Sequence, residues 1–410
     1  MEGKKTIRKD KRCKLDLFIV YVAFFMIFAG GGSLQQYIIP FLKQHGIGWP
    51  WNTLVLATLY LSFAAFRLLN LYLLPHLPPR MPLTLGLLTY TLLPGAMLWS
   101  NKTAFLLAAA VLWGWGASAA WMTSSLSVTH LTEKQKRGKG AGALYAAVHA
   151  GFLLGVPLIG ALSGMQRERQ ALHWVFWITT AGSLVSLGTR PHTQYLPGPP
   201  WRSLIPRDKD QWIVAFVQFA SSLAYGLMLG SFAALVRERV LWSATGIYTL
   251  FYAFRFFLSL IAGETADRLP LRTLLIAAFF LSASSLAVSL LTGGFWGLAL
   301  GATGLALQVA VVPVACLALV GQGPAANRAR RYALSFVGRD LGVACALLTG
   351  LGLEFGRSFS LEGTVALFAF VFLACSLLCA LLTQGRDSSS PPSGGTGDAS
   401  QTMGDKETLD

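Results

Sequence analysis

Long apolar stretches, separated by short groups of charged residues, proline and glycine, run through almost the whole chain. A helix that crosses a bilayer needs about 20 mostly apolar residues, and the stretches are close to that length. The pattern therefore predicts twelve membrane-spanning helices without a sizeable soluble domain. The predicted helices are residues 15–42, 51–75, 82–99, 104–128, 141–164, 171–189, 211–235, 244–263, 273–292, 295–320, 332–354 and 363–383.

A proline-rich interruption at residues 190–210 divides these helices into two sets of six. We expect a basic N-terminal segment at 1–14, a six-helix bundle at 15–189, a linker at 190–210 and a second bundle at 211–383. The tail at 384–410 is rich in Ser, Gly, Pro and acidic residues, so it is predicted to be disordered. The predicted fold class is an all-α polytopic membrane protein.

An internal repeat relates the two predicted bundles. Residues 60–83 match residues 248–271 at a constant offset of 188, and the identical pairs include Arg67 with Arg255. Shared composition explains matching apolar residues but not two matching arginines, so the bundles are predicted to be pseudo-symmetric halves. The other identical pairs are Tyr60 and Tyr248, Phe63 and Phe251, Ala65 and Ala253, Phe66 and Phe254, Arg80 and Arg268, Pro82 and Pro270, and Leu83 and Leu271.

The net charge of +15 on a chain that is 54% apolar is a second feature that needs an explanation. In a soluble protein, such a basic chain would suggest a nucleic-acid partner. Here 23 of the 33 basic residues fall on the side that carries both termini and seven fall on the other side. The positive-inside rule then places both termini in the cytoplasm of an integral inner-membrane protein, with lipid headgroups rather than nucleic acid as partners of the surface charges.

The segment GETADRLPLR, at residues 263–272, resembles the G-x-x-x-D-R-x-G-R-R loop signature of the major facilitator superfamily. The resemblance implies two six-helix halves that transport by alternating access, with Asp267 and Arg268 as gating residues. Two departures suggest a one-sided latch: Pro270 replaces the usual glycine, and Pro79 stands where the first half would carry the acid. The alternative is a cluster of charges that extend from a helix end to the membrane surface.

Two further segments resemble this family. The run GFLLGVPLIG at 151–160 is similar to the glycine-proline pattern of its antiporters, and YALSFVGRDLG at 332–342 is similar to the start of its helix 11. Close helix packing through small residues is the alternative explanation for the first run. The paired arginines on helices 2 and 8 also resemble those of the nitrate and nitrite porters.

Four charged residues are predicted to lie at the depth of the bilayer core: Arg67, Arg255, Arg339 and Asp340. Such residues are costly in a bilayer and normally face a partner or a wet cavity. Three cations and one anion leave a charge of +2, which favours an anionic substrate between Arg67 and Arg255. The alternative is local pairing, with one arginine held by Asp340 as a structural support. We assign Arg339 to the gating residues.

Polar neighbours complete the predicted binding site. Tyr60 and Tyr248 precede the paired arginines by seven residues and so share a helix face with them. Further candidates lie on the same face or on helices that line the cavity in the family: Asn70, Gln35, Gln36, Gln218 and Gln308. Coupling to a proton requires a group that changes charge, for which the candidates are His149 and Asp340.

The predicted function is secondary active transport of a small, anionic solute, with a proton as a possible second partner. One alternative is a proton-coupled exporter of hydrophobic or cationic compounds. Another is a receptor or assembly protein that keeps the fold without transporting. An enzyme is not expected, because the sequence has neither a metal-ligand cluster nor a nucleophile-base arrangement, and we assign no catalytic residue, metal or cofactor.

Overall fold

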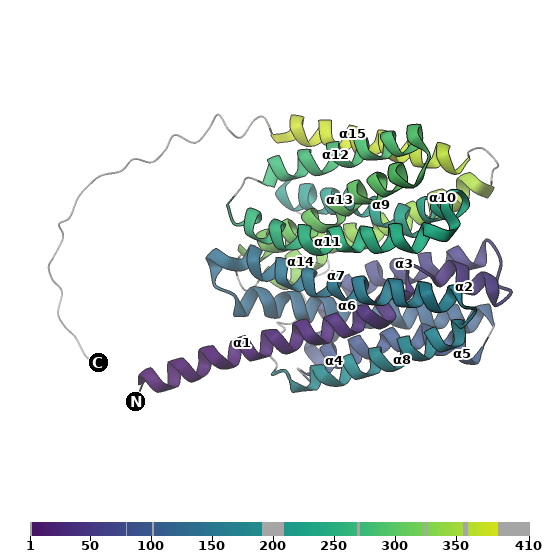
Figure 1. Ribbon diagram of the computed structural model, residues 1–410. Helices are drawn as coiled ribbons and strands as arrows, with labels where there is room; N and C mark the ends of the chain where they lie inside the picture. The colour runs from purple at the N-terminus through teal and green to yellow at the C-terminus, as the bar shows by residue number, and fades with distance from the viewer. Residues whose placement is uncertain are drawn as a thin grey trace, which may run out of the picture.

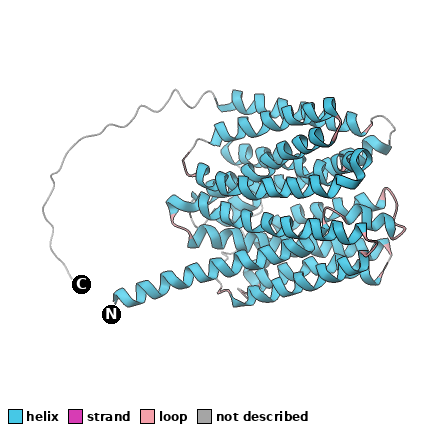
Figure 2. Ribbon diagram, viewed as in Figure 1, coloured by secondary structure: helices cyan, strands magenta, loops and turns pink. Residues whose placement is uncertain are grey.

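The chain folds into a bundle of long helices, as the ribbon diagrams of the computed structural model illustrate (Figures 1 and 2). The structure describes residues 2–78, 80–100, 102–190, 209–268, 271–322, 324, 327–355 and 360–383. These residues contain no strand, and they form twelve helical spans that are long and apolar enough to cross a membrane. The predicted all-α fold with twelve spans is confirmed. Most of the predicted linker and the whole predicted tail lie outside the described residues.

The first six spans form one half, which Figure 1 draws in purple to teal. Its helices are α1 (Glu2–Ile27), η1 (Phe28–Gly32), α2 (Ile38–Gln44), α3 (Trp51–Leu73), η2 (Leu74–His76), α4 (Met81–Leu88), η3 (Thr89–Thr91), α5 (Leu92–Trp99), α6 (Thr103–Leu131), η4 (Lys134–Lys136), α7 (Arg137–Gly164), α8 (Glu168–Val185) and η5 (Ser186–Gly188).

The last six spans form the other half, in green to yellow, and the two halves lie side by side along their length (Figure 1). Its helices are α9 (Lys209–Leu229), α10 (Ser231–Val240), η7 (Leu241–Ser243), α11 (Ala244–Ala266), α12 (Leu271–Thr292), α13 (Phe295–Gln322), α14 (Arg328–Phe355) and α15 (Leu361–Thr383). The halves meet most extensively where α7 packs on α11 and where α3 packs on α14. We call the end that carries Lys134, Lys136 and Arg268 the basic end, and the other the opposite end.

The first membrane span of each half is broken at a glycine inside the stretches predicted as helices at residues 15–42 and 211–235. Gly30 has φ −96° and ψ −106°, and Gly230 has φ −103° and ψ −111°. These angles lie outside the α-helical region, so each glycine breaks the regular course of its helix and bends the span. At Gly30 a side chain would also collide with α8, because its Cβ would lie 2.3 Å from Thr179 Oγ1. The segments beyond the breaks, α2 and α10, lie at the opposite end (Figure 1).

Glycines bring two helix pairs into backbone contact at equivalent places in the two halves. A Cβ on Gly155 of α7 would lie 2.1 Å from the Ala29 carbonyl oxygen, and one on Gly342 of α14 would lie 2.2 Å from that of Phe219. Gly151 and Gly338 make similar approaches one turn earlier, and both pairs differ by 187 residues (338 − 151 and 342 − 155). The glycines of the 151–160 run therefore hold α7 tightly against the first span.

We expect Gly155→Ala to lower the melting temperature of the purified protein, because the added methyl group has no space beside the Ala29 carbonyl. Overpacking of this kind costs about 1–3 kcal/mol of unfolding free energy. Gly164→Ala is the matched control in the same helix, since a Cβ there meets nothing within 4 Å. Equal melting temperatures for the two variants would contradict the close contact.

Candidate substrate-binding site

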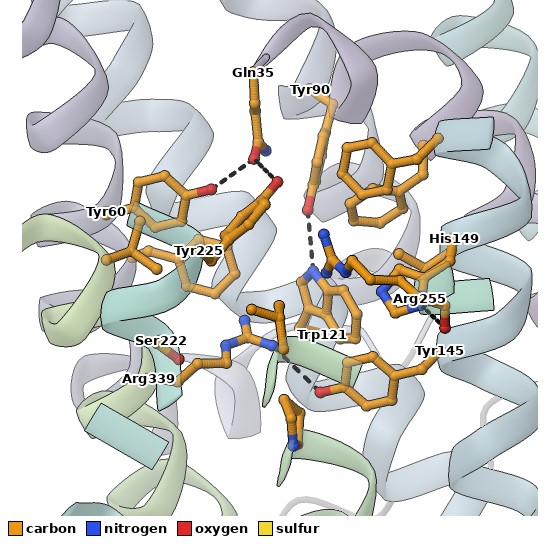
Figure 3. Close-up of a pocket in the computed structure, with 17 residues that line it drawn as sticks. Gln35, Tyr60, Tyr90, Trp121, Tyr145, His149, Ser222, Tyr225, Arg255 and Arg339 are labelled. Atoms are coloured by element: carbon orange, nitrogen blue, oxygen red, sulfur yellow. Dashed lines mark hydrogen bonds between the residues drawn. The ribbon is translucent and has the colours of Figure 1, made fainter. Parts of the chain in front are cut away.

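A cavity lies between the two halves at the middle of the bundle (Figure 3). The centre of a water molecule fits over about 60 Å³ of it. Eight of the 17 residues that line it are Phe, Tyr or Trp, so the walls are largely aromatic. The lining residues are Phe28, Gln35, Tyr60, Phe63, Tyr90, Trp121, Tyr145, Val148, His149, Phe152, Ser222, Tyr225, Arg255, Val309, Pro313, Arg339 and Val343.

Arg255 is the cavity's most unusual group, because its charge has no anionic partner among the described residues. It is 5% exposed, and its Nε and Nη1 atoms have no hydrogen-bond acceptor. Aromatic rings surround the guanidinium, with Tyr225, Phe251 and Tyr252 centred 4.8, 5.1 and 5.2 Å from Cζ. Such rings attract a cation without neutralising it. The buried charge of Arg255 is therefore available to an anion that enters the cavity.

His149 lies beside Arg255 and faces the same cavity (Figure 3). Its Nδ1 atom lies 3.1 Å from the Arg255 carbonyl oxygen and 2.9 Å from Ser259 Oγ. Because a carbonyl oxygen only accepts hydrogen bonds, contact with it places the proton of a neutral ring on Nδ1. The buried Nε2 atom, which has no partner, is then an acceptor in the neutral ring and becomes a donor only when His149 is protonated.

The other three central charges named from the sequence form one cluster between the halves. Arg67 of α3 donates from Nε to Asp340 Oδ2 at 2.5 Å, and both side chains are fully buried. Arg339 donates from Nε to Asp340 Oδ1 at 3.1 Å and from Nη1 to the Tyr145 hydroxyl at 3.3 Å. Asp340 therefore lies between two arginines, and contacts from α14 reach both α3 and α7 of the first half.

The two arginines related by the repeat thus have different surroundings. Arg255 lines the cavity, whereas Arg67 does not, and the second arginine at the cavity is Arg339. Arg67 also donates to the Tyr332 hydroxyl at 2.9 Å, so two of its three nitrogens are occupied. This arrangement matches the alternative given by the sequence, in which Asp340 holds one arginine as a structural support.

The other predicted ligands also divide into residues that line the cavity and residues that do not. Tyr60 lines the cavity and donates to Gln35 Oε1 at 2.6 Å. Its mate Tyr248 does not line it, because its hydroxyl donates to the Ala233 carbonyl at 2.9 Å and accepts from Arg237. Asn70 also lies away from the cavity and donates to Ser118 Oγ at 3.0 Å.

Three glutamines were predicted as ligands besides Gln35, and none of them lines the cavity. Gln36 connects the halves, since it donates to the Met228 carbonyl at 3.4 Å and accepts from the Tyr252 hydroxyl at 3.2 Å. Gln218 and Gln308 are fully buried, and their amide groups have no partner among the described residues. A binding role for these residues stays a prediction.

Sequence reasoning missed two important aromatic residues of the cavity. Tyr145 lies four residues before His149, a spacing that places both on one helix face and could have identified it. Trp121 also lines the cavity, with its ring 5.1 Å from Arg339 Cζ. No pattern on α6 distinguishes it from Trp113, which is fully buried.

At the basic end, Asp267 connects the halves and Arg268 does not. The Asp267 carboxylate accepts from the backbone amides of Gly138 at 2.8 Å and Lys139 at 3.0 Å. It thereby caps the N-terminus of α7, where a negative charge is favourable. Arg268 pairs with Glu264 of its own helix at 2.9 Å. A second connection, missed in the sequence, runs from Arg137 Nη1 to the Gly321 carbonyl of α13.

We expect Asp267→Ala to speed hydrogen exchange in the first turn of α7, because the Gly138 and Lys139 amides lose their acceptor. Loss of a cap costs about 1 kcal/mol, which corresponds to roughly fivefold faster exchange. Hydrogen-exchange mass spectrometry of the peptide that begins α7 measures this change. Arg268→Gln is the neighbouring control and should leave the exchange of that peptide unchanged; equal effects of the two variants would contradict the cap.

Comparisons with known proteins agree with this architecture. The family model described as Major Facilitator Superfamily matches residues 17–233. No curated protein matches the chain. Among solved structures, a variant of the E. coli fucose:proton symporter FucP is similar with a TM-score of 0.67 and 13% identity, covering 91% of this chain and 100% of that one. FucP in an outward conformation gives a TM-score of 0.67 and 14% identity, with coverage of 90% and 98%.

The human organic anion transporter MFSD10 (TETRAN) gives a TM-score of 0.68 at 15% identity and covers 90% of this chain and 99% of that one. At such low identities the structures establish the fold alone. The family model spans more than half of the 410 residues. The chain therefore belongs to the major facilitator superfamily, a family of membrane transporters.

Proposed function

We propose that this protein is a secondary active transporter for a small anion, which binds to Arg255 in the central cavity. The observation that carries the proposal is a buried guanidinium that lines the cavity, has two nitrogens without acceptors and pairs with no described carboxylate. Arginine suits planar oxyanions because its donors are held in a rigid, flat group. Arg339 adds a second positive charge at the cavity wall.

Contacts between the halves on both sides of the cavity support alternating access. Toward the opposite end, Tyr225 of α9 donates to Gln35 Oε1 at 3.2 Å, and Tyr37 lies within hydrogen-bond distance of Thr245. Toward the basic end, Asp267 caps α7 and Arg137 reaches α13. Opening either side requires one of these sets to break while the other set stays intact. We propose that the structure represents an occluded state of the cycle.

We further propose that the basic end faces the cytoplasm of the inner membrane. The proposal rests on the excess of Lys and Arg in the loops at that end. We also propose that the chain divides into one six-helix bundle at residues 15–189 and a second at residues 211–383.

Of the alternatives, export of cations has the weakest support in the site. Asp340 is the one acid in the central charge cluster, and two arginines already occupy it. A cation entering the cavity would meet Arg255 and Arg339 without a free counter-charge. A role without transport has no specific observation in its favour.

The proposed function is tested by thermal unfolding of the purified, full-length protein with a panel of small ions. We expect nitrate, acetate or butyrate to raise the melting temperature in a saturable manner, whereas tetramethylammonium should not. A saturating anion is then tested for uptake into proteoliposomes, with protein-free liposomes as control. Stabilisation by the cation alone, or by none of the ions, would contradict the proposal.

Of the two candidates for proton coupling, His149 has the more suitable surroundings. The charged and titratable groups facing it are Arg255 and Tyr145, and only the protonated ring offers a donor from Nε2 to an anion on Arg255. We expect His149→Gln to retain anion binding but to lose the acceleration of uptake by an inward proton gradient. Uptake by the wild type that is unaffected by collapsing the gradient would remove the coupling role.

A further inference from the structure

The second notable property of the cavity is that nearly all its hydroxyl groups are already engaged. Tyr60 and Tyr225 both donate to Gln35, Tyr145 accepts from Arg339, and Tyr90 accepts from Trp121 Nε1 at 3.2 Å. Tyr60 and Tyr225 therefore present mainly their rings to a bound solute, whereas Tyr90 and Tyr145 use their hydroxyl oxygens but not their hydroxyl hydrogens in these bonds. Figure 3 illustrates the same hydrogen bonds around the cavity.

The remaining wall is apolar. It includes Val148 and Phe28 from the first half and Val309, Pro313 and Val343 from the second. The unpaired charge of the lining, in contrast, belongs to Arg255, because Arg339 shares the carboxylate of Asp340. The cavity thus has one position for an anionic group and an apolar remainder.

We propose that the substrate is a small monocarboxylate with an apolar, aliphatic body, and this inference rests on the proposed function. A carboxylate carries its acceptor oxygens at one end, so both can face the Arg255 nitrogens that have no acceptor. Nitrate and phosphate carry acceptors on every side, and some would face hydrocarbon without a donor, which is costly. A second carboxylate, as in succinate, would lack a free cation.

The size of the cavity limits the body of the substrate. The space of about 60 Å³ is well below the roughly 150 Å³ of an apolar cavity that binds benzene in another protein. The occluded cavity therefore suits a chain of a few carbon atoms better than an aromatic ring. Butyrate and propionate are the probes of this class.

The test compares melting temperatures of the purified protein with butyrate, propionate, nitrate, phosphate, succinate and the neutral isostere butyramide. We expect the two monocarboxylates to stabilise at concentrations at least about tenfold lower than the other solutes. Nitrate, phosphate or succinate acting as well as butyrate would overturn this inference and leave the proposed function intact. Absence of stabilisation by every anion would instead overturn the proposed function.

A pair of variants on α13 tests the apolar wall directly. Val309→Thr replaces a lining methyl group by a hydroxyl of similar size, and we expect it to weaken butyrate binding about fivefold relative to nitrate. Val312→Thr is the matched control, because Val312 is fully buried on the same helix but does not line the cavity. It should lower the melting temperature without altering the preference between the two anions. A preference that is unchanged in Val309→Thr would overturn the inference.

Discussion

Asp340→Asn is expected to lower the unfolding free energy of the protein by about 3–5 kcal/mol, because it leaves Arg67 buried without a counter-charge. Both side chains of this ion pair have no exposed surface. Water cannot replace the lost carboxylate at Arg67, whereas Arg339, which is 14% exposed, has access to the cavity. A large fall in melting temperature measures the effect, and an unchanged value would contradict the role of Asp340 as a structural support.

Two further variants separate the ion pair from general effects of substitution. The double variant Arg67→Met with Asp340→Leu should recover much of the lost stability, since a buried pair replaced by apolar groups of similar size is often neutral. Glu264→Gln removes an exposed pair with Arg268, and such pairs contribute at most about 1 kcal/mol. From the highest to the lowest melting temperature, the order should therefore be Glu264→Gln, then the double variant, then Asp340→Asn.

Arg255→Lys is expected to weaken anion binding about 100-fold while changing the melting temperature without ligand only slightly. Loss of a buried, charged hydrogen-bonding group typically costs several kcal/mol of binding free energy. An ammonium group retains the charge but lacks the flat set of donors that holds a planar oxyanion. The measurement is the concentration of butyrate or nitrate that gives half-maximal stabilisation.

Arg67→Lys is the matched variant at the position related by the internal repeat. We expect it to bind anions as the wild type does, because Arg67 does not line the cavity. The sequence instead predicts equal losses at both positions, since it places both arginines around the substrate. Equal losses would therefore support the symmetric site and contradict the assignment of Arg255 as the main ligand.

The number and type of helices could be predicted because a bilayer imposes a minimum apolar length on every span. The breaks at Gly30 and Gly230 could not be predicted in this way. Both glycines lie within apolar stretches, and hydrophobicity does not record the backbone angles that interrupt the helix.

The common level of the four central charges along the bundle could also be predicted, because the rise per residue of a helix fixes distance along its axis. The pairing of these four charges with one another could not be predicted. Asp340 meets Arg67 across 273 residues of sequence, and this contact depends on how α3 and α14 are rotated where the halves meet. A repeat in the sequence indicates that two residues occupy equivalent positions in the two halves. It does not indicate that both residues bind the same kind of partner, because one can face the substrate while the other pairs with a counter-ion.

The broken first spans have a consequence for how the two ends open. At the basic end, the contacts between halves are made by the uninterrupted helices α7, α11 and α13. At the opposite end, Gln35, Gln36 and Tyr37 follow the break at Gly30, and Met228 precedes the break at Gly230. A short segment can swing about each glycine while the rest of its half stays in place. We therefore expect the contacts made by these segments at the opposite end to break by local movement about a glycine, whereas those at the basic end break as whole helices separate.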